Sequence, residues 1–289
     1  MMFHCGSKNN KEESKPAIAI VTGASSGIGL ATAGALTEKG YRVFGTSRKA
    51  TGEDVNGVTM LPCDVTDDDS VTKMVDEVLA KAGRIDLLVN NAGISLVAAA
   101  EDSSTKQAQD LFNVNVFGVM RVANAVLPTM RKQGSGRIVN ISSVVGFLPA
   151  PFHTLYASTK HAIEGYSESL DHEVRTFGIR SVLVEPAFTR TSIDQSPMKA
   201  DQPVSVYDGM RTNMESLLVA GIAKGDAPEI VARTILQAAT DNFPNLRYTA
   251  GKSAAFLRFI RRFGSAAFVD KSLRKFNKLP IIKTKSCCC

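Results

Sequence analysis

The chain has 289 residues, 44% of them hydrophobic and 21% charged, which is the composition of an ordinary globular protein. This length is enough to bury a core without disulfides or metal ions. No apolar run approaches the roughly eighteen residues of a bilayer-spanning helix, and residues 1–15 lack the apolar centre of a secretory signal. We therefore expect a cytoplasmic protein.

The net charge of +6 is unevenly distributed. Residues 252–289 contain ten Lys and Arg and the single acid Asp270, a net charge of +9, which leaves −3 for the rest of the chain. The body therefore gives no reason to expect a nucleic acid partner.

The five cysteines include Cys63 in an apolar run and three at the C-terminal end, and no pair has metal-ligand spacing. This pattern indicates a reduced compartment, no bound metal, and a buried Cys63 thiol.

Short apolar runs alternate with amphipathic stretches, the pattern of a parallel sheet with crossover helices. The predicted strands are residues 17–22, 42–46, 58–63, 85–90, 137–142 and 180–185, with a further short strand at 246–249. The predicted helices are residues 28–39, 67–81, 107–132, 156–177 and 226–241. We therefore predict an α/β fold, a single doubly wound Rossmann-like domain over residues 17–251 with six to seven parallel strands.

Three segments fall outside this alternation. Residues 1–16 are predicted to be a disordered tail, and residues 187–225, which contain two prolines and several methionines, a mobile substrate lid. Residues 252–289 form a basic extension in which Phe256, Phe259, Ile260, Phe263 and Ala267 recur at helical spacing. Such a helix can make a peripheral contact with an anionic membrane. The favoured interpretation of this helix is that it packs over the substrate cleft or at a subunit contact.

A glycine-rich loop joins the first strand to the first helix, with the sequence TGASSGIG at residues 22–29. Glycines let the backbone approach a pyrophosphate closely, and the helix N-terminus offers free N–H groups and a positive field. The position between a strand and a helix favours a dinucleotide site over a simple tight turn. The candidate cofactor residues here are Gly23, Ser25, Ser26, Gly27, Ile28 and Gly29.

The end of the second strand bears on the choice of dinucleotide. Enzymes that use NAD place an acid there to hold the ribose hydroxyls, whereas this chain has Ser47 and Arg48. A guanidinium can pair with the 2′-phosphate of NADP(H) through two hydrogen bonds, so we predict NADP(H). The alternative is that Arg48 is a solvated loop residue. Asp64, after the third strand, is placed to accept a hydrogen bond from the adenine amino group. Its alternative role is to cap the next helix, but Asp67 is better placed for that.

Several motifs occur together further along the chain. Tyr156-Ala157-Ser158-Thr159-Lys160 follows Ser143 by thirteen residues, Asn90-Asn91-Ala92-Gly93 follows the fourth strand, and Asn115 lies in the long helix. In order and spacing they resemble the short-chain dehydrogenase/reductase family, over about residues 17–191 and more loosely to 251. The resemblance implies a homodimer or homotetramer. The stretches Glu168-Ser169-Leu170, Phe177-Gly178-Ile179 and Val184-Glu185-Pro186 look most like the retinol and hydroxysteroid dehydrogenase branch.

The resemblance assigns roles to particular residues. Tyr156 is the proton donor and acceptor, Ser143 rather than Ser142 bonds the substrate oxygen, and Asn115 holds a water in a proton relay through Lys160. Thr191 bonds the nicotinamide carboxamide. Ala187 departs from the family's usual Pro-Gly, which leaves the geometry of that loop open. The further cofactor contacts that it implies are Val65, Asn91, Ala92, Gly93, Tyr156, Lys160, Pro186 and Thr189.

Elementary electrostatics supports the pairing of Tyr156 with Lys160 independently. At i and i+4 on a helix the two side chains share one face. A cation at about 4 Å in an effective dielectric of about 20 contributes on the order of 4 kcal/mol. That is enough to lower the pKa of a phenol from about 10 by up to about three, which makes Tyr156 a usable acid and base near neutrality. The alternative reading of Asn115 is a polar helix residue that faces solvent.

Apolar residues flank these motifs and indicate a lipophilic substrate, although each of them can equally belong to the core. They are Ile94, Phe147, Leu148, Pro149, Phe152, Leu155 and Phe188, with His153 as a further candidate contact. We therefore predict an NADP(H)-dependent oxidoreductase that reduces a lipophilic ketone or aldehyde. The alternatives are an NAD-dependent alcohol dehydrogenase running oxidatively and a non-catalytic NADPH sensor.

Overall fold

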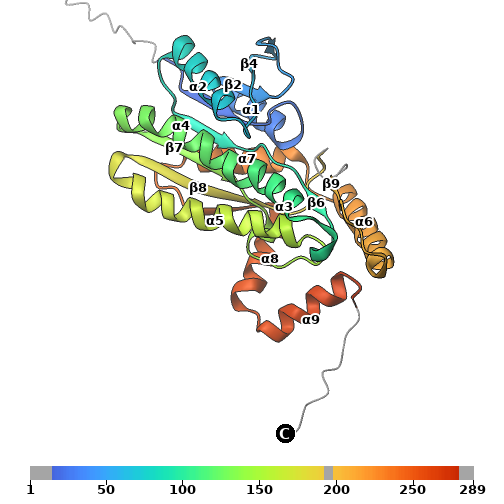
Figure 1. Cartoon of the computed structure of the whole chain (residues 1–289). Coiled ribbons are helices and arrows are strands. Elements are labelled where there is room, and N and C mark those ends of the chain that lie inside the picture. The colour runs from blue at the N-terminus through green and yellow to red at the C-terminus, as the bar shows by residue number, and fades with distance from the viewer. Residues whose placement is uncertain (1–14, 192–197, 280–289) are drawn as a thin grey trace, which may run out of the picture.

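The computed structural model describes residues 15–191 and 198–279 (Figure 1). The predicted disordered tail therefore lies almost entirely outside the described residues, as does the end of the C-terminal extension. The described part confirms the predicted fold, with helices on both faces of a mainly parallel sheet (Figure 1).

The central sheet has the strand order β10-β8-β7-β5-β1-β2-β4-β3. Its strands are β1 (Ile18–Val21), β2 (Arg42–Ser47), β3 (Asp54–Val55), β4 (Val58–Pro62), β5 (Leu87–Asn90), β7 (Gly136–Ile141), β8 (Ile179–Pro186) and β10 (Arg247–Ala250). All pairs are parallel except β3 with β4. The strand order reverses between β1 and β5, which is where such folds open a crevice for a ligand.

Strand β3 is the eighth strand, where six to seven were predicted. It pairs with β4 through a two-residue turn, Asn56-Gly57, and both turn residues have positive φ, 53° and 80°. Asn-Gly is the dipeptide that such a hairpin turn favours, because both of its central residues must adopt this left-handed conformation. The strand was missed because it is only two residues long and exposed, with no apolar run to mark it.

The core lies in two layers, one on each side of the sheet. The helices are α1 (Gly27–Glu38), α2 (Asp68–Ala82), α3 (Thr105–Phe112), α4 (Gly118–Gln133), α5 (Thr154–Val174), α6 (Asp208–Ala223), α7 (Pro228–Thr240), α8 (Gly251–Phe263) and α9 (Ala266–Phe276). Along β1, Ile18 and Ile20 pack with residues of α2, α4 and α5, whereas Ala19 and Val21 pack with residues of α1 and α7. Successive strand residues point to opposite faces, so a strand covered on both faces is continuously apolar.

The predicted long helix over residues 107–132 is interrupted. It comprises α3, a π-helical turn (Asn113–Phe117) and α4. Such turns are frequent at functional sites because the extra residue re-aims a side chain, and here the turn contains Asn115. By length and composition, Thr105–Gln133 is the one stretch of the described residues that passes as a candidate membrane span, although we predicted none. Its residues Val122, Val126 and Met130 are buried in the core against the sheet, as in the core helix of a globular protein.

The C-terminal half of the chain departs most from the predicted pattern. The predicted lid, residues 187–225, contains the sixteen-residue helix α6 and the short strand β9 (Met198–Lys199), which pairs with β6 (Leu96–Val97). The C-terminal extension forms two helices instead of one, because Ser265 accepts a hydrogen bond from the Phe268 N–H and so begins α9. Helices α6, α8 and α9 project from the body of the domain (Figure 1).

Candidate active site

A cavity of about 440 Å³ lies beside the carboxyl ends of β1, β2, β4 and β5. It brings together most of the predicted cofactor residues: Gly23, Ser25, Ser26, Gly27, Ile28, Arg48, Asp64, Val65, Asn91, Ala92, Gly93 and Thr191. Of the other predicted cofactor residues that the structure describes, Tyr156 lines the second cavity described below, whereas Gly29, Lys160, Pro186 and Thr189 line neither. Thr189 instead pairs through its backbone with Asp226. Sequence reasoning missed Thr46, Cys63 and Thr66, which lie at the same strand ends.

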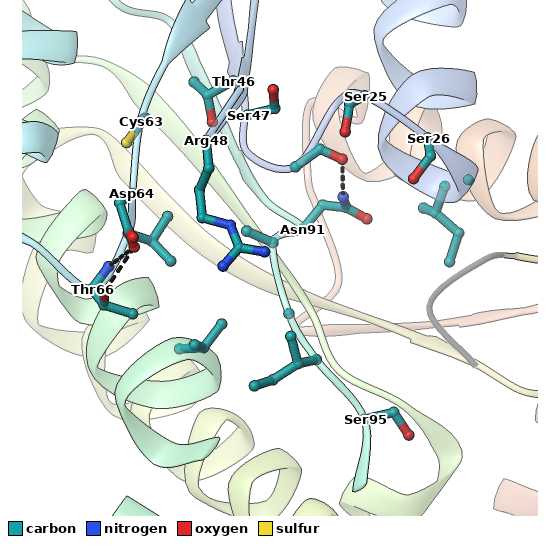
Figure 2. A pocket seen from close by; sticks show the side chains of 18 of the residues that line it. Ser25, Ser26, Thr46, Ser47, Arg48, Cys63, Asp64, Thr66, Asn91 and Ser95 are labelled. Atoms are coloured by element: carbon teal, nitrogen blue, oxygen red, sulfur yellow. Dashed lines mark hydrogen bonds between the residues drawn. The ribbon is translucent and has the colours of Figure 1, made fainter. Parts of the chain in front are cut away.

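Within the glycine loop, Gly29 is packed too tightly for any larger residue. A Cβ atom on Gly29 would lie 2.2 Å from the carbonyl oxygen of Gly23 and 2.5 Å from Nδ2 of Asn91. Asn91 Nδ2 donates to the carbonyl oxygens of Thr22 and Gly23, at 2.9 and 3.1 Å, and so holds the loop in place. Figure 2 shows Asn91 at the wall of the cavity. The first turn of α1, which the structure describes in full, has no acidic side chain. These features fit a bound pyrophosphate, because N–H groups and the positive helix end face the ligand.

Arg48 extends into this cavity from the end of β2, and its side chain is exposed (Figure 2). Asp64 faces the same cavity from the end of β4, and Thr66 donates to its Oδ1 from Oγ1 at 2.7 Å and from the backbone N–H at 2.9 Å. These hydrogen bonds to Thr66 lower the pKa of the Asp64 carboxyl. Asp67, not Asp64, caps α2 by accepting from the Ser70 N–H, which agrees with the sequence analysis.

Cys63 is buried, as predicted, and lies in the wall of this cavity. Burial raises the pKa of its thiol to about 11, because the thiolate loses its hydration. We expect iodoacetamide at pH 8 to label Cys63 in the native protein about a hundredfold more slowly than an unperturbed thiol, since the thiolate is the nucleophile. Peptide mass spectrometry after timed labelling measures this, with labelling in urea as the control. Equal rates in the two conditions would contradict a buried thiol.

A second cavity, of about 730 Å³, adjoins the first, since Ser95 lines both. Ser143 and Tyr156 line it together, as the sequence motif requires. The hydroxyl of the competing Ser142 is buried and donates to Glu164 Oε1 at 2.8 Å, so it is committed to an internal hydrogen bond. The structure therefore places Ser143, and not Ser142, on the wall of the cavity that Tyr156 also lines.

Lys160 and Asn115 lie behind these hydroxyls. Lys160 is buried on α5, with Nζ 5.6 Å from the centre of the Tyr156 ring, and donates to the Ile141 carbonyl oxygen at 2.9 Å. Asn115 is 1% exposed, which rules out the solvent-facing alternative. Its amide accepts from the Ile94 N–H and donates to the Ile94 carbonyl oxygen, at 2.9 and 2.8 Å. This pairing is possible because the π-helical turn aims Asn115 at that loop. A water relay through Asn115 stays a prediction.

The rest of the second cavity is mainly apolar. Of the apolar residues singled out in the sequence, Leu148, Pro149 and Phe188 line it, Ile94 lines the first cavity, and Phe152 belongs to a core cluster with α6. His153 also lines the second cavity, and burial lowers the pKa of its imidazole, which favours the neutral form at pH 7.

Much of this wall comes from the two segments that the sequence analysis offered for it, the lid at residues 187–225 and the C-terminal helix over the cleft, although of its helix residues there only Phe256 and Ile260 were singled out. The residues that α6, α8 and α9 contribute are Met214, Leu217, Leu218, Gly221, Ser253, Phe256, Leu257, Ile260, Val269, Ser272, Leu273 and Phe276, and Asn277 follows α9. The spacing of Met214, Leu217, Leu218 and Gly221, at i, i+3, i+4 and i+7, is a helical signal that would have found α6.

A glycine loop that fits a pyrophosphate, and an adjoining cavity lined by Ser143 and Tyr156 with Lys160 near the Tyr156 ring, fit a nicotinamide-dependent oxidoreductase acting on CH–OH and C=O groups. The family model for short chain dehydrogenase matches residues 17–202. The chain belongs to the short-chain dehydrogenase/reductase family, as its motifs indicated.

Individual relatives agree with this assignment. The chain is 44% identical over 172 residues to a 3-ketodihydrosphingosine reductase of Bacteroides thetaiotaomicron, a match that covers 60% of this chain and only 64% of the relative. It is 33% identical over 253 residues to retinol dehydrogenase 8 of Bos taurus, with 80% of each chain covered. A short-chain dehydrogenase from Streptomyces avermitilis has the same fold, with a TM-score of 0.78 and 32% identity over 92% of this chain and 97% of that one.

Proposed function

We propose that this enzyme uses NADP(H) to interconvert a lipophilic ketone or aldehyde with its alcohol, and that it works chiefly as a reductase. The observation that carries the proposal is the position of Ser143 and Tyr156 on the wall of a mainly apolar cavity of about 730 Å³. Such a cavity buries an apolar substrate and leaves two hydroxyls to orient its oxygen. The names of two relatives, for 3-ketodihydrosphingosine and for retinol, are consistent with a substrate of this kind.

In this scheme each polar residue has a defined task. A bound nicotinamide supplies the hydride in the reductive direction and accepts it in the oxidative one. Tyr156 protonates the substrate oxygen, and Ser143 donates a hydrogen bond that stabilises the charge developing there. The Lys160 ammonium favours the ionised form of Tyr156 and so keeps it able to exchange protons near neutral pH.

The preference for NADP(H) rests on Arg48. Asp64 is the only carboxylate that lines the cofactor cavity among the described residues, and it follows β4, not β2. The end of β2, where a ribose-binding acid would exclude NADP(H), instead presents the Arg48 guanidinium. An exposed guanidinium can meet a 2′-phosphate without first breaking an internal ion pair.

Fluorescence titration of the purified protein with NADPH and NADH tests this preference. We expect NADPH to bind at least about tenfold tighter, because charge-assisted hydrogen bonds form only with the 2′-phosphate, and we expect Arg48→Ala to lose that margin. Lys49→Ala is the matched control, since Lys49 is also exposed but does not line the cavity. If NADH binds wild type equally well, Arg48 is a solvated loop residue and oxidation of an alcohol with NAD becomes the favoured function.

Measuring turnover distinguishes an enzyme from the remaining alternative, a non-catalytic NADPH sensor. We expect the enzyme to reduce at least one of a set of lipophilic ketones and aldehydes. Loss of NADPH absorbance measures that reduction. A non-catalytic NADPH sensor would bind the cofactor and turn over none of them, but the presence of both Tyr156 and Lys160 favours an enzyme. The homodimer or homotetramer stays a prediction.

A further inference from the structure

The outer side of α8 and α9 presents aromatic side chains to solvent. Phe259, Phe263 and Phe268 are 61%, 68% and 53% exposed, and none of them lines the substrate cavity. The rings of Phe259 and Phe263 lie 5.0 Å apart, and Phe268 packs beside the turn that joins the two helices. Scattered exposed apolar residues are normal, but neighbouring exposed phenylalanines mark a surface that binds something.

The same two helices are strongly basic. Residues 252–279 carry eight Lys and Arg and the single acid Asp270. Among them, Arg258 pairs with the buried Glu185, whereas Arg262 and Lys271 are exposed. Helices with phenylalanines on one side and Lys and Arg around them have the composition of segments that lie in a bilayer interface.

We propose that this aromatic and basic surface, formed by Phe259, Arg262, Phe263, Phe268 and Lys271, docks on an anionic membrane. Charge complementarity decides between this occupant and a second copy of the chain. A twofold contact through this surface would set two strongly basic segments against each other, whereas anionic lipid headgroups match them.

The surface is held in a fixed position on the domain. Arg258 Nη1 donates to Glu185 Oε2 at 2.5 Å, and Glu185 is fully buried on β8. Arg261 Nε donates to the Phe147 carbonyl oxygen at 3.1 Å, in the loop that follows Ser143. A preformed surface does not have to be ordered at the moment of binding, which favours docking.

Docking would also orient the substrate cavity. Phe256 and Phe276 line that cavity, and yet they are 62% and 59% exposed, so they lie at its mouth. The mouth therefore opens on the same two helices that carry the docking surface, and a lipophilic molecule would enter from the bilayer without crossing water. This second part rests on the proposed function, whereas membrane binding itself does not.

Vesicle sedimentation of the full chain tests the docking. We expect at least about tenfold stronger binding to phosphatidylcholine vesicles containing 30% phosphatidylserine than to pure phosphatidylcholine, because several basic residues lie near the surface. The double substitution Phe259→Ser/Phe263→Ser is expected to weaken binding about tenfold or more, and Arg262→Glu/Lys271→Glu about tenfold.

Matched controls lie away from this surface. Phe243→Ser replaces a phenylalanine that is 94% exposed in the loop before β10, and Lys73→Glu reverses an exposed charge on α2; both are expected to bind as wild type does. Circular dichroism checks that every variant is folded. Absent binding to anionic vesicles, equal binding to neutral ones, or unchanged binding of the surface variants would overturn the proposal. So would a dimer that only the phenylalanine variant disrupts. Because vesicle binding needs no turnover, failure of the proposed function would not affect this result.

Discussion

Replacing Tyr156 with phenylalanine is expected to lower turnover by about a thousandfold and to leave NADPH binding within about twofold of wild type. The substitution removes one hydroxyl, the proposed proton donor, and positioned general acids contribute about 10²- to 10⁴-fold to catalysis. The ring remains to fill its place on the cavity wall, where it lies near Lys160. Steady-state rates on a substrate from the carbonyl screen, with fluorescence titration of NADPH, measure the two quantities.

The matched control is Ser158→Ala on the same helix. Ser158 is exposed, and its hydroxyl donates to the Thr154 carbonyl oxygen one turn earlier, so its loss is expected to leave the rate unchanged. If Tyr156→Phe retained more than about a tenth of the wild-type rate, another group in the cavity, such as Ser143 or His153, would have to supply the proton. A protein whose function survived the substitution entirely would be a sensor rather than an enzyme.

A second large effect is expected from Arg247→Met, which should lower the free energy of unfolding by about 3–5 kcal/mol at pH 7. Arg247 on β10 forms ion pairs with Glu164, with Glu168 at 2.6 Å and with Glu185 at 2.8 Å. The side chains of Glu164 and Glu185 are 6% and 0% exposed. Removing this cation leaves the buried Glu164 carboxylate without an ion-pair partner among the described residues and leaves the buried Glu185 with Arg258 alone. This loss of compensation for buried charge is the costly step. Urea unfolding followed by circular dichroism measures the loss.

The loss is expected to grow with pH. Burial raises the pKa of Glu185 even with its arginine partners in place, and removing Arg247 raises it further. Below about pH 4 the Glu185 carboxyl is protonated in both the folded and the unfolded state, so it does not lower the stability of the variant. As pH rises, the unfolded chain releases its proton first, and the folded state loses relative stability until its own raised pKa is passed. The deficit should therefore be larger at pH 8 than at pH 5.

Arg258→Met is the control for this network. Arg258 contacts Glu185 alone among the acids of the described residues, and its side chain is 40% exposed, so solvent offsets part of its loss. We expect a cost of about 1 kcal/mol, well below that of Arg247→Met. Equal costs for the two variants would show that Arg247 does not hold the buried carboxylates together.

The sequence by itself determined the parts of this protein that are encoded locally. Alternating apolar runs predicted the parallel strands, because strands covered on both faces must be continuously apolar. The glycine loop and the Tyr156–Lys160 spacing predicted where the cofactor and catalytic groups lie, because a strand-to-helix turn and one helical turn fix those distances whatever the rest of the chain does. The Asn56-Gly57 turn was equally local, and it was missed only because its strand is so short.

The tertiary structure decided which residues of the predicted lid and of the C-terminal extension complete the site. The wall of the substrate cavity comes from α6, α8 and α9, which follow the catalytic motif by some fifty to a hundred and twenty residues. The fold also brings Arg247 to Glu164 and Glu185, which come from α5 and β8, and nothing local in the sequence signals that contact. Likewise, Asn115 is aimed at Ile94 by a π-helical turn that no periodicity signalled. Contacts of this kind depend on how whole elements pack, and packing is set by the sum of many side chains rather than by any short motif.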